Sequence, residues 1–366
     1  MGTTRRSQSG FSIVELMVAA VIGLIGSVVI FQVFSVFEGQ KRTTATGGDA
    51  QVNLAIAMHR IETDARQAGF GINDPAFFGC AVSGGEEDPL GSGSGTSFTL
   101  TLVPVNIVQG SSTVDSVSGG ALKADTLTFM YGSSDLAHFP PKLIQNLASP
   151  ASNYRVSNRH GFQVGDVMVL AELRGTPLAP VCAMSQARSL PAIVGNLDVI
   201  DHSNGSYDQG GITLNTRFSY AGLGPNYTAE TTRVFNLGRA PVVNTYSVNN
   251  GRLMLQSFRG AAQPVMDGVV QMQVRYGKDT GTDNIVDVYD DITPTTPANW
   301  AKVLTIRVAL AARVGQYEKT EVSPATILLW GGGPVWTLTS EERHYRYHVI
   351  DTIIPLRNII WRRAAS

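Results

Sequence analysis

The chain has 366 residues, of which 43% are hydrophobic and 16% charged, and its formal net charge is −1. A charge this close to zero gives no general attraction to nucleic acid, and no block of like charges forms a basic arm. We therefore do not expect DNA to be a direct ligand. The 38 glycines and the low share of charged residues favour strands and loops over a largely helical protein.

A continuous apolar stretch covers residues 11–34, and Glu15 is its only charged residue. As a helix, these residues would extend about 36 Å, enough to cross a bilayer core of about 30 Å. The only charges before this stretch are Arg5 and Arg6, which predict a cytoplasmic N-terminus. We therefore expect a single-pass membrane protein with a large head on the far side of the membrane.

Glu15 is unexpected inside such a helix, because a carboxylate at mid-bilayer costs on the order of 2.5 to 3.5 kcal/mol. Cleavage between Gly10 and Phe11 would create an α-amino group four residues before Glu15, on the same helix face. That group, with a pKa of about 7.7 to 8.0, is mostly protonated at neutral pH and would neutralise the carboxylate within or between chains. The alternative is an ordinary signal anchor in which Glu15 reaches the membrane interface.

The segment that carries this pattern is Gly10-Phe11-Ser12-Ile13-Val14-Glu15-Leu16, between a short basic leader and an apolar run. It resembles the class III signal of type IV prepilins. The resemblance implies removal of residues 1–10, N-methylation of Phe11 by a prepilin peptidase and methylase, and a role for Glu15 in filament assembly. A secretory signal peptide would instead need a small-residue cleavage site after its apolar core.

Small residues recur every four positions within the apolar stretch, at Ala19, Gly23 and Ser27. Such a stripe lets a second helix approach closely in lipid or in a packed filament core. The alternative is that these residues are present because glycine and alanine are common in spanning helices.

Residues 35–70 predict a joint followed by an amphipathic helix. Gly47-Gly48 should loosen or interrupt the helix, so that the long rod is broken or bent there. Apolar residues then follow helical spacing and should pack on a sheet: Leu54, Met58, Ile61, Ala65 and Ala68. Four charged residues should point largely outward: Arg60, Glu62, Asp64 and Arg66.

The remaining residues, 71–366, predict a head rich in antiparallel strands, divided into two subdomains at about residue 240. Residues 83–97 are rich in glycine and serine and predict a loop. Strands are expected at 98–108, 125–131, 166–170, 193–200, 242–248, 252–258, 268–276, 302–314 and 344–354. The dipeptide Asn250-Gly251 predicts a type I′ hairpin turn. The fold class is therefore α+β, with a long N-terminal hydrophobic helix packed on a large β-rich head.

Two cysteines, Cys80 and Cys182, lie on the predicted non-cytoplasmic side. An even count in an oxidising compartment favours one disulfide, and the alternative is two buried reduced thiols. Neither cysteine lies in a C-x-x-C or histidine-rich context, so redox catalysis and zinc binding are not expected.

Carboxylates recur in one short segment, at Asp279, Asp283, Asp287 and Asp290. Calcium prefers six to eight oxygen ligands from such a spacing. The segment departs from an EF-hand, because Asn284 occupies the glycine position and Asp290 replaces the final glutamate. Two interpretations stay open, a calcium site and a solvated acidic loop, and no cofactor is otherwise required. The sequence has no nucleophile elbow, HExxH or Walker motif, so no enzyme activity is expected.

Further segments are typical of one family. Residues 64–70 (DARQAGF) precede the Gly79-Cys80 pair. Three segments follow later in the chain: a strand that ends in Arg275-Tyr276-Gly277, a strand over residues 303–314, and the closing segment 348–358. These segments resemble the PilW-type minor pilins of type IV pili, although residues 85–240 carry no specific match. The Arg-Tyr-Gly strand also occurs in the J-type pseudopilins of type II secretion.

The PilW resemblance implies an inner-membrane protein with a periplasmic head that later occupies the pilus tip. There it would prime assembly with other minor pilins, the major pilin and the inner-membrane assembly platform, supporting twitching, adhesion or DNA uptake. A J-type pseudopilin is the close alternative. A signal-anchored periplasmic enzyme or binding protein is the alternative from another class.

Overall fold

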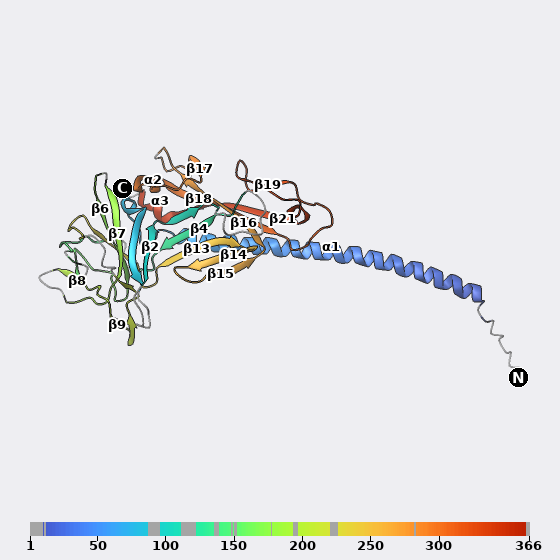
Figure 1. The fold of residues 1–366 in the computed structure, drawn as a ribbon, viewed down its shortest axis with the longest axis horizontal. Coiled ribbons are helices and arrows are strands. Elements are labelled where there is room, and N and C mark those ends of the chain that lie inside the picture. The colour runs from blue at the N-terminus through green and yellow to red at the C-terminus, as the bar shows by residue number, and fades with distance from the viewer. Residues whose placement is uncertain are drawn as a thin grey trace, which may run out of the picture.

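The computed structural model consists of a β-rich head and one long helix that projects from it (Figure 1). It describes Gly10 and residues 12–86, 96–110, 122–134, 139–147, 149, 152–176, 178–192, 197–219, 226–281 and 283–363. The expected α+β class is confirmed, because a long apolar helix precedes a mostly antiparallel head.

Helix α1 covers Ile13–Gln67 without a break. The predicted interruption at Gly47-Gly48 is therefore wrong, and Figure 1 shows one gently curved rod. A glycine costs a helix about 1 kcal/mol relative to alanine, which the helical turns on both sides outweigh. Gly47 also faces the head, since a Cβ at this position would lie 3.7 Å from Nε2 of His348. The small residue thus lets the helix run close to the last strand.

The part of the head furthest from the N-terminus of α1 contains a six-stranded sheet in the order β11-β1-β7-β6-β12, with β2 also paired to β1. Its strands are β1 (Cys80–Glu86), β2 (Thr96–Leu102), β6 (Val167–Arg174), β7 (Ala179–Gln186), β11 (Phe218–Ser219) and β12 (Arg233–Gly238). The pair β1–β7 is parallel, which differs from the expected antiparallel pairing, and the other pairs of this sheet are antiparallel.

Two further sheets lie beside α1. The five-stranded sheet β15-β14-β13-β4-β3 contains β3 (Val105–Val108), β4 (Thr126–Tyr131), β13 (Val242–Asn249), β14 (Arg252–Ser257) and β15 (Gln263–Asp267). The four-stranded sheet β17-β16-β18-β21 contains β16 (Val269–Lys278), β17 (Val288–Asp290), β18 (Val303–Arg313) and β21 (Tyr347–Pro355). The five-stranded sheet thus combines strands from both sides of residue 240, and the division into two subdomains stays a prediction.

Short elements complete the described fold. Three two-stranded pairs are formed by β5 (Tyr154–Val156) with β8 (Asp198–Ile200), β9 (Ser206–Gln209) with β10 (Ile212–Asn215), and β19 (Thr326–Leu328) with β20 (Val335–Thr337). The short helices are η1 (Pro75–Phe77), α2 (Pro297–Trp300), η2 (Glu342–His344) and α3 (Arg357–Arg363).

The hairpin between β13 and β14 forms as predicted. Asn250 has φ of 50° and Gly251 has φ of 70°, as a type I′ turn requires at both central positions. The alternation predicted for residues 302–314 is confirmed in the first part of β18, where Leu304, Ile306 and Val308 are buried. It is wrong beyond Val308, because Ala309 and Ala311 are buried as well and both faces of the strand are covered there. The loop predicted for 83–97 is wrong at both ends, where β1 extends to Glu86 and β2 begins at Thr96. Residues 87–95 lie outside the described residues.

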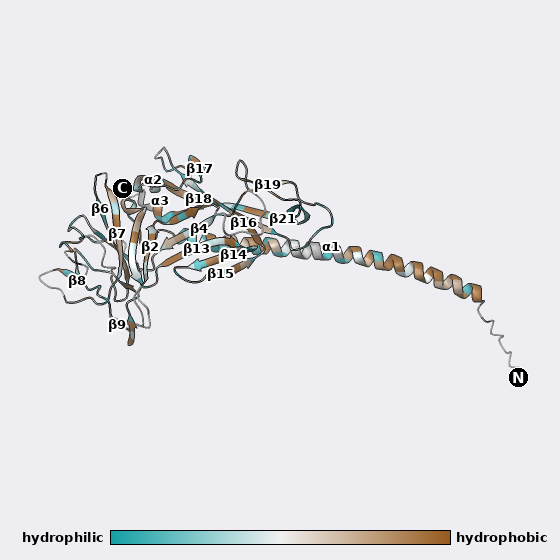
Figure 2. Cartoon of the chain, viewed as in Figure 1, coloured by the Kyte–Doolittle hydropathy of each residue, from teal (hydrophilic) through white to brown (hydrophobic). Residues whose placement is uncertain are grey.

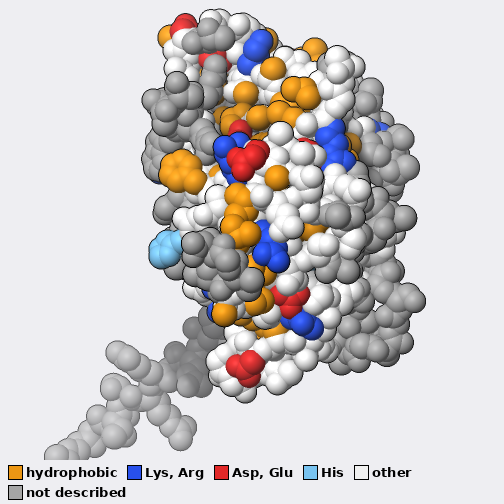
Figure 3. Space-filling model, turned by 90° about the vertical axis from the view of Figure 1, so that its left-hand side faces the viewer, with side chains coloured by type: hydrophobic (Ala, Val, Ile, Leu, Met, Phe, Trp, Pro, Cys, Tyr) orange, Lys and Arg blue, Asp and Glu red, His pale blue; other side chains and the backbone are white. Residues whose placement is uncertain are grey.

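The main core joins the second half of α1 to strands of all three large sheets. The five residues of the predicted helical stripe are all buried in it: Leu54, Met58, Ile61, Ala65 and Ala68. In Figure 2 the projecting half of α1 is mostly coloured as hydrophobic, although the head does not cover it. At the opposite end of the head, apolar side chains form a broken line interleaved with charged ones (Figure 3).

A disulfide joins Cys80 on β1 to Cys182 on β7, with Cα atoms 6.0 Å apart, and confirms the predicted pairing. Both cysteines are buried within the six-stranded sheet, and 102 positions separate them in sequence. Closing so long a loop removes much conformational entropy from the unfolded chain.

We expect the double variant Cys80→Ala with Cys182→Ala to lower the free energy of unfolding by about 2 to 5 kcal/mol. Urea unfolding followed by circular dichroism measures this difference. Dithiothreitol should destabilise the unmodified protein to a similar degree and leave the double variant unchanged. A double variant as stable as the unmodified protein would contradict a stabilising role for the disulfide.

Candidate assembly interface

The first half of α1 has the properties of a membrane anchor. The most apolar 18-residue window within Ile13–Glu38 has a mean hydropathy of 2.6, and none of it is buried against the head. Large apolar side chains such as Ile22, Leu24 and Phe31 are more than half exposed. Apolar surface of this extent requires lipid or other helices as its environment, because water would penalise its exposure.

Glu15 lies in the first turn of α1 and is exposed. A carboxylate at this position interacts favourably with the positive end of the helix dipole. Ser12 is the N-cap residue and Gly10 precedes it, also exposed, whereas Phe11 lies outside the described residues. The cleavage and methylation at Gly10 and Phe11 and the assembly role of Glu15 therefore stay predictions.

The small residues Ala19, Gly23 and Ser27 lie on the exposed half of α1 at four-residue spacing. A Cβ added at Gly23 would meet nothing within 4 Å, so the head does not explain the glycine. The Ser27 hydroxyl donates to the Gly23 carbonyl at 2.8 Å, which satisfies this polar group within the helix. A stripe of this kind is suited to close helix packing, and its use for that purpose stays a prediction.

Asp64 fixes α1 to the head, which the sequence reasoning missed by placing this residue outward. Its side chain is only 8% exposed. Oδ1 accepts from the Tyr131 hydroxyl at 2.9 Å, and Oδ2 accepts from the Tyr246 hydroxyl at 2.6 Å and from Nδ2 of Asn244 at 2.9 Å. The three donors come from β4 and β13, so one carboxylate connects the helix to two neighbouring strands.

This arrangement changes the pKa of the two tyrosine hydroxyls. Burial raises the pKa of the Tyr131 and Tyr246 hydroxyls above the usual value, and the adjacent Asp64 carboxylate raises both further. Both hydroxyls therefore stay protonated at neutral pH and remain hydrogen-bond donors. Hydrogen bonds to an ionised acceptor are stronger than those between neutral groups.

The C-terminal end of α1 is held by hydrogen bonds to and from its backbone. Nδ2 of Asn358 donates to the carbonyls of Gln67 and Ala68 at 3.0 and 3.1 Å, where the helix ends. The amide of Gly69 donates to the Met130 carbonyl at 2.9 Å, and its φ of 82° is a conformation that favours glycine. Carbonyls at a helix end need such partners, because the helix itself provides none.

The variant Asp64→Ala should lower the free energy of unfolding by about 3 kcal/mol, because it leaves two buried hydroxyls and one half-buried amide without their acceptor. Urea unfolding of the full chain in detergent measures the change. The matched control is Glu62→Ala on the same helix, whose side chain pairs with Arg66 at 3.4 Å near the surface. That control should change stability by less than about 0.5 kcal/mol. Equal stability of the two variants would contradict the proposed role of Asp64.

The carboxylates of the acidic segment form hydrogen bonds and an ion pair with other groups of the same chain. Asp287 accepts from the Thr280 amide, the Thr280 hydroxyl and the Gly281 amide at 2.7 to 2.9 Å. Asp279 is buried and accepts from the Asn284 amide, and Asp283 accepts from the Ile285 amide. Asp290 forms an ion pair with Lys278. Within the described part of the chain, no group of three or more His, Cys, Asp or Glu is arranged to hold a metal ion, and calcium binding stays untested.

Comparison with known protein families gives two matches. Residues 5–31 match the prokaryotic N-terminal methylation motif, and residues 242–358 match the type IV pilus-assembly protein W family, PilW. The first match covers the start of the exposed helix. The second covers β13 to β21 and the beginning of α3, including Asn244, Tyr246 and Asn358, which hold α1.

No curated protein and no solved structure matches the chain. The first match lies on the exposed half of α1, and the second lies on elements, among them β18, β21 and α3, that contact the same helix. With a methylation motif at its N-terminus and a PilW segment at its C-terminus, the chain resembles the PilW-type minor pilins of type IV pili.

Proposed function

We propose that this protein primes assembly of a type IV pilus at the inner membrane and then lies at or near the pilus tip. The observation that carries the proposal is the division of α1 into two halves. One half packs an apolar stripe on the head, and the other is apolar, uncovered and has a single carboxylate in its first turn. A subunit that moves from a membrane into a filament needs such a helix, because neighbouring helices replace the lipid.

Processing would prepare the helix for this role. Removal of residues 1–10 would leave an ammonium group on Phe11, four residues and about 6 Å of helix rise before Glu15. The two opposite charges would neutralise each other within one chain or between neighbouring subunits, and so lower the cost of placing Glu15 in an apolar environment. The stripe at Ala19, Gly23 and Ser27 would then allow close approach of the neighbouring helix.

The size of the head favours a subunit that caps the filament over a subunit that repeats along its shaft. The head contains most of the 366-residue chain and is organised around three large sheets. Such a head is larger than a thin, closely repeating shaft requires. In this scheme residues 11–34 form the filament core, residues 35–70 lead into the head, and residues 71–366 select partners. These partners would be other minor pilins, the major pilin and the inner-membrane assembly platform.

The inferred location follows from the anchor. The protein would first be held in the inner membrane with its head in the periplasm, and would later reach the cell surface with the filament. There it would support pilus-dependent twitching, adhesion or DNA uptake. The Cys80–Cys182 disulfide is consistent with a periplasmic head, because disulfides persist in oxidising compartments.

The variant Glu15→Ala tests the proposal most simply. We expect normal membrane insertion but at least about a tenfold loss of surface filaments. The variant leaves the Phe11 ammonium without its partner, and a cost of about 1.4 kcal/mol is enough to shift the assembly equilibrium tenfold. Quantifying sheared pili and membrane-bound protein in the same cells separates assembly from insertion.

Glu38→Ala provides the matched control, because Glu38 is an exposed carboxylate at the other end of the same span. It should assemble normally. Unchanged filaments in Glu15→Ala cells would instead favour an ordinary signal-anchored periplasmic enzyme or binding protein.

A further inference from the structure

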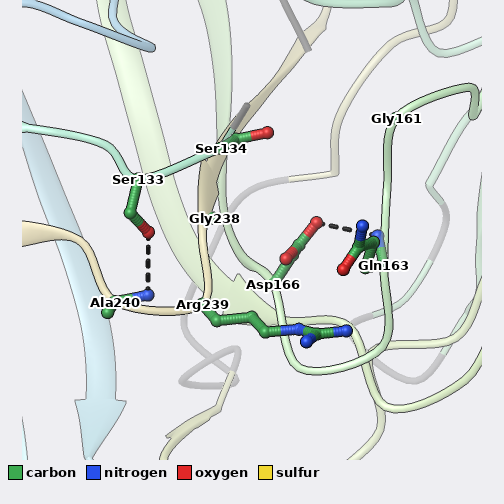
Figure 4. A pocket seen from close by; sticks show the side chains of 8 residues that line it. All are labelled: Ser133, Ser134, Gly161, Gln163, Asp166, Gly238, Arg239 and Ala240. Atoms are coloured by element: carbon green, nitrogen blue, oxygen red, sulfur yellow. Dashed lines mark hydrogen bonds between the residues drawn. The ribbon is translucent and has the colours of Figure 1, made fainter. Parts of the chain in front are cut away.

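A polar cavity of about 340 Å³ opens in the head between the five-stranded and six-stranded sheets (Figure 4). Its lining comes from three separate segments: Ser133 and Ser134 after β4, residues 161–166 before β6, and residues 238–240 after β12. This volume lies within the usual range for small-molecule sites. None of these residues has a role in the helix anchor or its junction with the head.

The floor of the cavity contains a carboxylate, Asp166, with hydrogen bonds to only one of its two oxygens. Asp166 is 3% exposed, and its Oδ2 accepts from the Gln163 amide and from Nδ2 of Asn236, both at 2.8 Å. Within the described part of the chain, both of these hydrogen bonds end on Oδ2, and Oδ1 has no hydrogen-bond partner. The two bonds to Oδ2 hold the loop together, but they leave the second oxygen available to a ligand.

Burial of this side chain has an electrostatic consequence. Desolvation raises the pKa of Asp166 above its usual value, although the hydrogen bonds to Oδ2 partly oppose the shift. Oδ1 is not among the described side-chain atoms that are buried without a hydrogen-bond partner, so it is open to the space of the cavity. A ligand hydroxyl that donates to Oδ1 would take the place of water there.

Two further polar groups line the same space. Ser134 is 7% exposed, and its hydroxyl is a further polar group in the lining. Arg239 lies on the rim, where its Nε donates to the Val164 carbonyl at 3.1 Å and leaves the rest of the guanidinium group without a described partner. The cavity therefore offers an acceptor at Asp166, donors at Arg239, and a group at Ser134 that can do both.

The charges define the chemical class of the ligand. An anionic ligand would be attracted by Arg239 but repelled by Asp166, and a cationic ligand would meet the reverse. A neutral ligand avoids both penalties, and hydroxyl groups can donate to Oδ1 while accepting from the guanidinium. Several hydroxyls on one small ring, as in a sugar, would satisfy these groups together.

A second, more apolar cavity of about 220 Å³ adjoins the first and shares Arg239 and Ala240 with it. Phe218 and Phe258 line it, and their ring centroids are 6.0 Å apart. Apolar and aromatic walls beside a few polar groups are the usual composition of small-molecule sites. They suit the C–H face of a sugar ring or an attached second ring.

We propose that the cavity around Asp166, Ser134 and Arg239 binds a neutral saccharide. This site is independent of the role proposed for α1, so either proposal can fail without the other.

Saturation-transfer NMR on the full chain tests the proposal. The protein is held in lauryldimethylamine oxide, a detergent without a sugar head group, and titrated with glucose, galactose, mannose and N-acetylglucosamine to about 20 mM. At least one sugar should bind with a Kd on the order of 1 mM or tighter. Asp166→Asn and Arg239→Gln should each weaken its binding at least about tenfold, because each removes a charged hydrogen-bonding group.

The matched control is Asp208→Asn, which changes an exposed carboxylate that accepts from the Gly211 amide outside the cavity. It should leave binding unchanged. Arg239 is exposed, so its variant keeps the test decisive if Asp166→Asn impairs folding. The proposal is wrong if no sugar gives transfer, if both cavity variants bind as well as the control, or if acetate or methylammonium binds in place of the sugars.

Discussion

The structure depends on one helix that has to satisfy two different environments. The second half of α1 is covered by strands of the head, whereas the first half exposes a continuous apolar surface. An amphipathic stripe explains the buried half, because its apolar residues follow helical spacing toward a single core. No comparable stripe exists in the first half, which is apolar on all sides and therefore needs lipid or other helices around it. The two halves form one uninterrupted rod, so the position of one determines the direction of the other.

Rigid attachment of this rod depends on polar contacts inside the junction. Asp64 connects α1 to β4 and β13, and Asn358 holds the end of the helix. Three of the residues involved belong to the segment that matches the PilW family, which gives that C-terminal region a physical role in orienting the N-terminal helix. A head fixed in this way keeps a constant orientation relative to the helix.

The sequence predicted the features that follow from local periodicity. The anchor, the buried stripe from Leu54 to Ala68, the strand around Ile306 and the Asn250-Gly251 turn depend on residues close in the chain, and all four are present. The cysteine pairing was also predicted, from count and compartment. The glycine-rich end of β1 was not, because tertiary pairing overrides the weak strand preference of Ser83-Gly84-Gly85. Asp64 resembled its charged neighbours on the helix, and only the folded chain places Tyr131 and Tyr246 beside it. The cavity at Asp166 unites three distant segments and left no local signal.

The assembly role proposed for the exposed half of α1 requires that the chain is processed to leave a positive charge beside Glu15. The N-terminal residue of the mature protein tests this most directly. Mass spectrometry of protein purified from surface filaments should find a chain that begins at N-methylated Phe11, without residues 1–10. Recovery of chains that still begin at Met1 from functional filaments would contradict the account.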